Sequence, residues 1–215
     1  MTQTQKMDLL TSLYIFCLVA SELMGSKVFT IVHIGSFALN ASVAIFLLPV
    51  IFSINDVITE VMGKERTASI IRSGFVVLVA LIVFSFLSIA LPPSMRFSAQ
   101  EPAYDMIFGK SIRIAVASLI SFAASEFLDV AVFVRLRKKL KGGLWLRNNA
   151  SNIVSQLADT VLFITLAFYA MDRGVADNFS FLAGLILPYW LLKCGMSVIE
   201  TPFVYLGVRW LNSKT

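Results

Sequence analysis

The stretch FSINDVITEVMGKERTASIIRSGF, residues 52–75, concentrates charge between two apolar segments. It leaves one long apolar run and soon returns to another, and between them it places Asp56, Glu60, Lys64, Glu65 and Arg66. Charge confined to so short a stretch is typical of a chain that leaves a bilayer, turns at its surface and enters again. We therefore expect further segments of membrane length in the rest of the chain.

The composition also favours a membrane protein. The chain has 215 residues, of which 58% are hydrophobic and 14% charged, and its mean hydropathy is +0.82. A soluble domain of this size cannot bury so much apolar surface, whereas a helix that crosses a bilayer needs about 20 mostly apolar residues. We expect one all-α integral membrane domain, residues 1–215, with six transmembrane helices near residues 9–29, 36–57, 69–91, 112–134, 150–170 and 181–206. The first segment is too long for the apolar part of a cleaved signal peptide.

Cations are distributed unevenly across this six-helix zigzag. The side with both chain ends carries Lys6, Lys64, Arg66, Arg72, Arg135, Arg137, Lys138, Lys139, Lys141, Arg147, Arg209 and Lys214. The other side carries Lys27, Arg96, Lys110, Arg113 and Arg173. Positive charge is retained inside, so we expect cytoplasmic termini in a multi-pass protein of the cell inner membrane. The basic run at residues 135–147 then lies beside anionic lipid, and no nucleic-acid partner is expected.

Neither a disulfide framework nor a metal centre is expected. Cys17 and Cys194 each lie in the middle of an apolar segment, where core packing is the default role of a thiol. The single histidine, His33, lies at the outer end of a predicted helix and cannot build a histidine-based metal site alone. We expect no cofactor and no catalytic residues.

The informative residues are ionisable groups inside apolar segments. Glu22, Glu126, Asp159 and Lys193 lie near the middle of the membrane, and Asp129, Glu200 and Asp56 lie nearer its cytoplasmic side. A charge at the bilayer centre costs about 2.5–3.5 kcal/mol on the insertion scale. Such groups normally face the interior of a bundle or a wet cavity, where they mark a binding site or a pathway.

Helical spacing groups these side chains into stripes, because residues three, four or seven apart share a face. The stripes are Glu126 and Asp129; Gln156, Asp159 and Thr160; and Lys193, Ser197 and Glu200. We expect them to face one cavity, and we expect Lys193 to neighbour a carboxylate, Asp159 or Asp129. An ion pair that only locks helices together is the alternative interpretation.

Two weaker patterns concern the course of the helices. Pro49, Pro188 and Pro202 fall inside predicted helices, and transporters use such interruptions near their binding sites. SELMGSKVF at residues 21–29 and SEFLDVAVF at residues 125–133 match at both ends, which would suit a three-plus-three inverted repeat. The other helix pairs show no comparable match, which favours coincidence.

FLLPVIFSINDVITEVMGKERTASIIRSGF, residues 46–75, resembles the signature of the queuosine precursor transporter family, the YhhQ-type group of vitamin uptake transporters. The matching positions are Pro49, Asn55, Asp56, Thr59, Glu60, Gly63 and Lys64. Met62 stands where an aromatic residue is common. Later blocks at residues 128–137, 151–168 and 191–208 are also similar, so the resemblance covers nearly the whole chain.

The resemblance implies a six-helix importer of queuosine precursors, 7-cyano-7-deazaguanine or its aminomethyl relative. A guanine-like edge presents an N1–H and an amino group that one carboxylate can accept together. Asp159 is our first candidate for this contact and Asp129 is the second. We expect Lys193 or Gln156 to donate a hydrogen bond to O6, and Gln156 shares its helical face with Thr160. Glu200 or Glu22 is available for the ammonium of an aminomethyl substrate.

Aromatic side chains and the opening stretch complete this hypothesis. Phe163, Phe168, Tyr189 and Trp190 are candidates for stacking on the flat ring, although most of them are expected to face lipid or core. Asn55, Asp56, Glu60 and Lys64 lie at the inner mouth, where an Asp56–Glu60–Lys64 ladder is expected to form a gate or a helix clamp.

The sequence is compatible with several transport mechanisms and assemblies. Uptake proceeds either by facilitated diffusion or by coupling to protons, and the chain works alone, as a homo-oligomer, or as the substrate-capturing subunit of a multi-component importer. An intramembrane enzyme is poorly supported, because no G-x-S-x-G motif and no helix-borne histidine accompany the carboxylates. A structural membrane protein would predict polar stripes that contact each other without a cavity.

Overall fold

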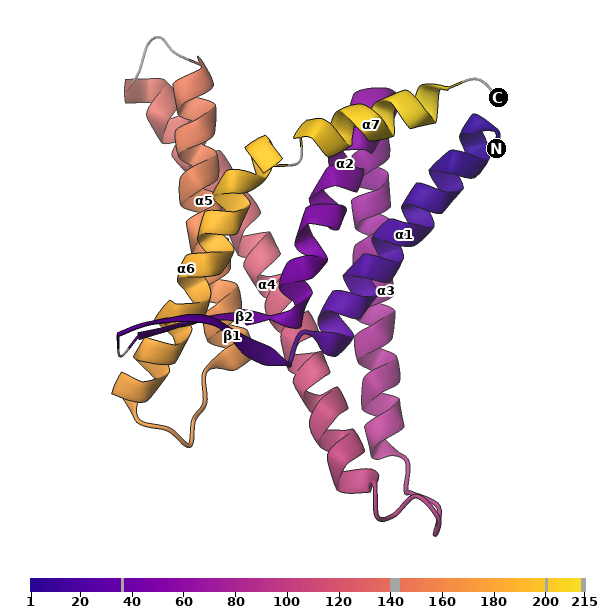
Figure 1. Ribbon diagram of the computed structural model, residues 1–215, viewed down its shortest axis with the longest axis vertical. Helices are drawn as coiled ribbons and strands as arrows, with labels where there is room; N and C mark the ends of the chain where they lie inside the picture. Colours follow the sequence, from indigo (N-terminus) through magenta and orange to yellow (C-terminus); the bar gives the residue numbers. More distant parts are fainter. Residues whose placement is uncertain (36, 140–143, 200, 214–215) are drawn as a thin grey trace. The chain divides into compact units, whose positions relative to one another are not determined.

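The computed structural model describes residues 1–35, 37–139, 144–199 and 201–213, and their side chains except at 126–127, 129–139, 144–152, 196–199 and 201. Almost all of the ordered elements are helices (Figure 1). In chain order they are α1 (Gln3–Met24), β1 (Val28–Ile34), β2 (Phe37–Ser42), η1 (Val43–Phe46), α2 (Leu48–Met62), α3 (Lys64–Ala90), α4 (Glu101–Lys139), α5 (Leu144–Phe168), α6 (Val175–Ile199) and α7 (Thr201–Asn212).

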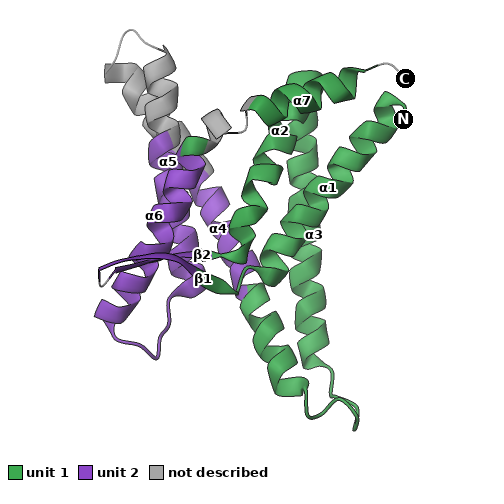
Figure 2. Cartoon of the chain, viewed as in Figure 1, with its two compact units in different colours: residues 1–29, 42–112, 195–215 green, residues 30–41, 113–194 purple. Residues whose placement is uncertain are grey.

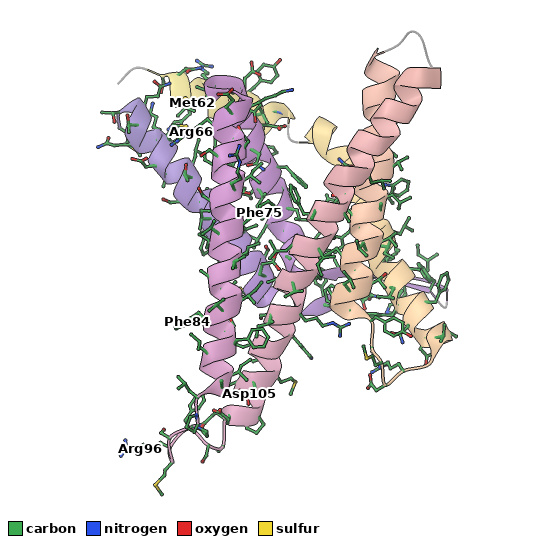
Figure 3. The ribbon with its side chains drawn as sticks, turned by 180° about the vertical axis from the view of Figure 1, so that it is seen from behind. Met62, Arg66, Phe75, Phe84, Arg96 and Asp105 are labelled. Carbon is green, nitrogen blue, oxygen red and sulfur yellow. The ribbon has the colours of Figure 1, made fainter. Side chains whose placement is uncertain are left out.

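Five helical segments in the described part of the chain are long and apolar enough to cross a membrane. They are Gln3–Met24, Val43–Met62, Lys64–Ala90, Glu101–Ser125 and Val175–Gly195, with mean hydropathies between 1.4 and 2.6. A shorter apolar stretch, Ile153–Phe168, lies within α5. The most apolar segment, α3, exposes large side chains such as Val76 at 69% and Phe84 at 72%. Figure 3 labels Phe84 on this helix. Exposed apolar surface on this scale suits a lipid solvent, so the expectation of a multi-pass membrane protein is confirmed.

The predicted end of the first helix at residue 29 and the predicted start of the second at residue 36 are wrong, because a β-hairpin occupies this part of the chain. Strands β1 and β2 form a two-stranded sheet. The sequence VFTIVHI of β1 is rich in β-branched and aromatic residues, which favour a strand. Gly35 follows with φ of +61°, a value that few other residues adopt, and this allows the chain to reverse. The second membrane-length helix therefore begins only after the hairpin.

Of the predicted helix 181–206, the structure describes α6 up to Ile199 and α7 from Thr201, and residue 200 lies outside the described residues. Pro202 lies in the first turn of α7, where its missing N–H breaks no helical hydrogen bond, whereas in the middle of a continuous helix it would remove one. Pro188, in contrast, lies inside α6.

The chain divides into two compact units (Figure 2). The first comprises residues 1–29, 42–112 and 195–215 and contains α1, α2, α3 and α7. Its core cluster consists of Met7, Tyr14, Cys17, Ile51, Ile54, Val57, Ile58, Ile70 and Leu211. Helices α2 and α7 approach closely, because a Cβ atom at Gly207 would lie 2.6 Å from Cγ2 of Val57. This unit brings the two ends of the chain together, since Nζ of Lys6 donates to the main-chain oxygens of Trp210 and Ser213 at 2.8 Å each.

The second unit comprises residues 30–41 and 113–194. Its helices α5 and α6 run in opposite directions and are joined by a short loop that Asn178 holds through hydrogen bonds with both main-chain groups of Ala170, at 2.9 and 2.7 Å. Strand β2 packs against α6, where a Cβ atom at Gly184 would lie 2.3 Å from the main-chain oxygen of Ala38. Arg113 of α4 donates to the main-chain oxygens of Leu166 and Tyr169 and so closes the end of α5. These contacts fix the two helices that carry the candidate site.

Candidate functional site

An ion pair joins α5 to α6. The ammonium of Lys193 lies 2.5 Å from Oδ2 of Asp159, and the two side chains are 13% and 22% exposed. Among the described residues this is the one ion pair between a basic and an acidic side chain. The expectation that Lys193 neighbours a carboxylate is confirmed, and of the two candidates the partner is Asp159. The side chain of Asp129 lies outside the described residues.

The pair is neither sealed in the core nor open to bulk water. Pairing offsets much of the cost of holding each charge away from water, and removal of one partner from a buried pair costs about 3–5 kcal/mol. Oδ2 of Asp159 accepts a hydrogen bond from Lys193, and Oδ1 is the second acceptor oxygen of the carboxylate. The carboxylate therefore keeps one acceptor for another donor, and the ammonium keeps further N–H groups.

Two neighbours on α5 differ in what they offer. Thr160 is 1% exposed and its hydroxyl donates to the main-chain oxygen of Gln156 at 2.7 Å, so its hydrogen is used within the helix. The side chain of Gln156 is half-buried and lies one turn before Asp159. Because the hydroxyl hydrogen of Thr160 is bound to a main-chain oxygen, the amide of Gln156 is the neutral group of this stripe that is available to donate to a ligand.

On α6, Trp190 provides a donor that the sequence-based hypothesis overlooked. It lies one turn before Lys193, and its Nε1 is buried without a hydrogen-bond partner among the described residues. A buried donor left without an acceptor costs about 1–3 kcal/mol. Because α5 and α6 run in opposite directions, Trp190 and Phe163 lie on the same side of the Asp159–Lys193 pair, towards the loop that joins the helices.

The other aromatic candidates for stacking are committed to packing. Phe163 and Phe168 contact each other edge to face, with ring centroids 6.3 Å apart, and both pack against the cluster of Ile114, Ala117 and Ala167. Tyr189 is 4% exposed. Trp190 is thus the half-buried aromatic residue beside the ion pair, and its signal in the sequence was its position three residues before Lys193.

The remaining predicted carboxylates lie either in the first unit or outside the described residues. Glu22 is buried in the first unit, at 5% exposure, whereas Asp159 and Lys193 belong to the second. Glu200 lies outside the described residues, as do the side chains of Glu126 and Asp129.

The expected Asp56–Glu60–Lys64 ladder is wrong. Asp56, Glu60 and Lys64 are exposed, and no ion pair forms among them in the described structure. Gly63, with φ of +83°, ends α2 and starts α3, so Lys64 does not continue the helical face of Glu60. The spacing of four residues has this meaning only within one unbroken helix.

Neutral groups connect the helices at this turn instead. The hydroxyls of Thr59 on α2 and Thr67 on α3 lie 2.8 Å apart. The hydroxyl of Thr59 also donates to the main-chain oxygen of Asn55, and that of Thr67 to the main-chain oxygen of Gly63. One turn further into the unit, the side chain of Asn55 is hydrogen-bonded to the hydroxyl of Tyr14 on α1. Oδ1 of Asn55 is buried without a partner among the described residues. The charged stretch therefore holds α1, α2 and α3 together by its Asn and Thr side chains, and its charges face outwards.

Comparison with known proteins identifies relatives of the chain. A family model described as "Putative vitamin uptake transporter" matches residues 42–207. The "Probable queuosine precursor transporter" of Bacillus subtilis (strain 168) is 32% identical over 175 residues, which are 80% of this chain and 74% of the relative. The "Queuosine precursor transporter" of Escherichia coli (strain K12) is 26% identical over 82% of this chain and 77% of the relative.

A third relative is the "Probable queuosine precursor transporter" of Haemophilus influenzae. It is 29% identical over 68% of this chain and 60% of its own length. No solved structure matches the chain. The matched region contains Asn55, Asp159, Lys193 and Trp190, since all four lie within residues 42–207.

Proposed function

Because the chain belongs to the vitamin uptake transporter family, we propose that it imports queuosine precursors, 7-cyano-7-deazaguanine or 7-aminomethyl-7-deazaguanine, across the cell inner membrane. It is a multi-pass membrane protein of a transporter family and not an enzyme. The observation that carries the proposal for the site is the partly exposed Asp159–Lys193 pair between two helices. The printed names of the three relatives support the substrate class.

The proposed topology has six transmembrane helices with both termini in the cytoplasm. Helix α5 is then the sixth span, in addition to the five segments of membrane length. The hydrogen bonds from Lys6 to Trp210 and Ser213 support it, because they place the first turns of α1 beside the end of α7. An even number of crossings would return the chain to the side on which it starts, and the excess of cations on that side favours the cytoplasm. The proposed single transport domain and a three-plus-three repeat stay predictions.

Recognition of the heterocycle is proposed to centre on Asp159. The N1–H and the amino group of a 7-deazaguanine lie side by side, and Oδ1 of Asp159 accepts from this edge while Oδ2 stays bound to Lys193. The remaining N–H groups of Lys193 and the amide of Gln156 face the O6 acceptor. The indole N–H of Trp190 is a further donor to O6, because a substrate carbonyl would satisfy a group that is otherwise buried without a partner.

The other predicted site residues keep subsidiary roles in this proposal. The assignment of the ammonium of an aminomethyl substrate to Asp129, Glu200 or Glu22 stays a prediction, and the hydroxyl of Thr160 donates to the main-chain oxygen of Gln156. Asn55, with its buried Oδ1, is the polar group of the inner-mouth set that the first unit encloses, and Asp56, Glu60 and Lys64 lie on the surface. All four residues of this set are proposed to act at the cytoplasmic mouth of the transport pathway.

Reconstitution tests the proposal directly. The purified chain is placed alone in liposomes, and uptake of radiolabelled 7-cyano-7-deazaguanine is compared with that of labelled guanine and adenine. Saturable uptake of the deazaguanine is expected. Binding without uptake would favour the substrate-capturing subunit of a larger importer, and neither binding nor uptake would refute the assigned substrate.

A complementary experiment uses a bacterium that cannot synthesise the precursor and lacks its own importer. Expression of the chain is expected to restore queuosine in tRNA when the precursor is supplied in the medium. Unchanged tRNA in cells that carry the folded chain in their membrane would contradict the proposal.

A further inference from the structure

Helix α7 has three distinct faces. Val204, Gly207, Val208 and Leu211 face inwards, and Leu211 is 1% exposed within the core cluster of the first unit. Phe203, Leu206 and Trp210 form an apolar stripe, at 61%, 65% and 37% exposure. Tyr205, Arg209 and Asn212 form a third, more polar stripe, and all three are exposed. Residues at these spacings share one side of a helix.

The inward face fixes α7 on the unit, so the helix is not a loose tail. Gly207 is so close to Val57 of α2 that no side chain fits between the two helices. At the other end, Lys6 of α1 is 4% exposed, and its Nζ donates to the main-chain oxygens of Trp210 and Ser213 and to Oγ of Ser213, at 2.8, 2.8 and 2.9 Å. A cation at the C-terminal end of a helix also interacts favourably with its dipole. The apolar stripe is therefore held outwards in a defined orientation.

The length and course of α7 exclude a further crossing of the membrane. Its 12 residues span about 18 Å, whereas the hydrocarbon core is about 30 Å thick. Within the first unit, α7 runs across the end of α2 and α3, close to the turn between them (Figure 1). Seen from behind, Met62 and Arg66 lie at this same end (Figure 3).

The surroundings of the stripe indicate what covers it. Met62 adds apolar surface at 43% exposure, and the exposed cations Lys64, Arg66 and Arg209 accompany it. An apolar stripe bordered by cations is the pattern of a helix that lies in the plane of a membrane interface, with its apolar side about 5–10 Å deep and its cations at anionic headgroups. Water alone would leave Phe203 and Leu206 with most of their apolar surface hydrated.

We propose that α7 is an in-plane interfacial helix, whose Phe203, Leu206 and Trp210 enter the boundary of the acyl chains while Arg209, with Lys64 and Arg66, contacts the phosphates of anionic phospholipids. This inference does not rest on the transported substrate, since it uses only the packing of α7 and the exposure of residues on α7, α2 and α3.

Site-directed spin labels test it in the intact protein. Single cysteines replace Phe203, Leu206 or Arg209 in a Cys194→Ala background, and the unsubstituted background serves as the blank because Cys17 is 2% exposed. The labelled proteins are studied in nanodiscs of phosphatidylcholine, with or without phosphatidylglycerol. Collision with oxygen, which concentrates in lipid, is compared with collision with a water-soluble nickel chelate.

The labels at positions 203 and 206 are expected to favour oxygen over the nickel chelate several-fold more than the label at 209. Phosphatidylglycerol should increase this difference, and Arg209→Gln in the Leu206→Cys protein should remove the increase. Equal access of the chelate to all three positions would show that the stripe faces water and would overturn the proposal. Shielding from both reagents, with a short label-to-label distance between copies, would assign the stripe to a second copy of the chain and overturn it as well.

Discussion

The ammonium of Lys193 on α6 lies 2.5 Å from the carboxylate of Asp159 on α5, and neither side chain is completely buried. A pair that only held two helices together would gain most from complete enclosure by further hydrogen bonds. The bond from Lys193 occupies Oδ2 of Asp159, and the carboxylate has Oδ1 as a second acceptor. This geometry suits a carboxylate that binds its lysine permanently and a substrate transiently.

The first prediction concerns Asp159 alone. Asp159→Asn places an amide where the substrate presents two N–H donors, so one acceptor oxygen becomes a donor. Uptake of 7-cyano-7-deazaguanine is expected to fall by about a hundredfold, the equivalent of losing two charge-assisted hydrogen bonds. Transport assays in proteoliposomes measure the loss, and the amount of monodisperse protein after extraction controls for insertion. Uptake at the rate of the unsubstituted chain would refute the role given to Asp159.

The second prediction separates binding from helix packing. The double substitution Asp159→Lys with Lys193→Asp keeps an ion pair between α5 and α6 but exchanges its ends. Resistance to unfolding in detergent is expected to recover relative to either single change, whereas uptake stays lost because the acceptor has moved to the other helix. Recovery of uptake together with stability would mean that the pair is structural.

The third prediction concerns the indole of Trp190. Trp190→Phe keeps an aromatic ring and removes the N–H, so uptake of 7-cyano-7-deazaguanine should fall by about fivefold through loss of a neutral hydrogen bond. The matched control is the analogue with sulfur in place of O6, a weaker acceptor that keeps N1–H. The substitution should affect that analogue less. Equal loss for both substrates would assign Trp190 to packing.

The fourth prediction tests the close crossing of α2 and α7. A methyl group at position 207 would lie 2.6 Å from Val57, so Gly207→Ala is expected to cost about 1–3 kcal/mol of stability. Because the clash is with the side chain of Val57, the same change should cost less in a Val57→Ala background. Denaturant unfolding in detergent measures both differences, and additive effects would contradict the packing described here.

The fifth prediction concerns the contact between the chain ends. Lys6→Met removes a buried cation that donates to three oxygens at the end of α7, and we expect a loss of about 2 kcal/mol. Lys110→Met, at an exposed position on α4, is the control and should change stability little. Earlier proteolytic release of the C-terminal segment in the Lys6 variant would locate the effect at α7.

Much of the fold was predictable because hydropathy over about 20 residues reports the solvent around a helix. The segments in α1, α3, α4 and α6 follow from that average. The position of Lys193 inside an apolar segment also predicted a carboxylate beside it, since the free energy of an unpaired cation at that depth of the membrane would be too high. The average did not resolve the hairpin at residues 28–42, where apolar β-branched residues resemble part of a membrane helix until Gly35 reverses the chain.

By itself the sequence determined that this chain crosses a membrane repeatedly and holds paired charges inside it, because the transfer free energies of side chains are additive and local. The tertiary structure decided which partners meet: Asp159 with Lys193, Tyr14 with Asn55, and Lys6 with the end of α7. It also decided that Gly63 separates Glu60 from Lys64 and that Trp190 keeps a free N–H among the described residues. Such outcomes depend on the space between elements distant in sequence, and no local pattern specifies that space.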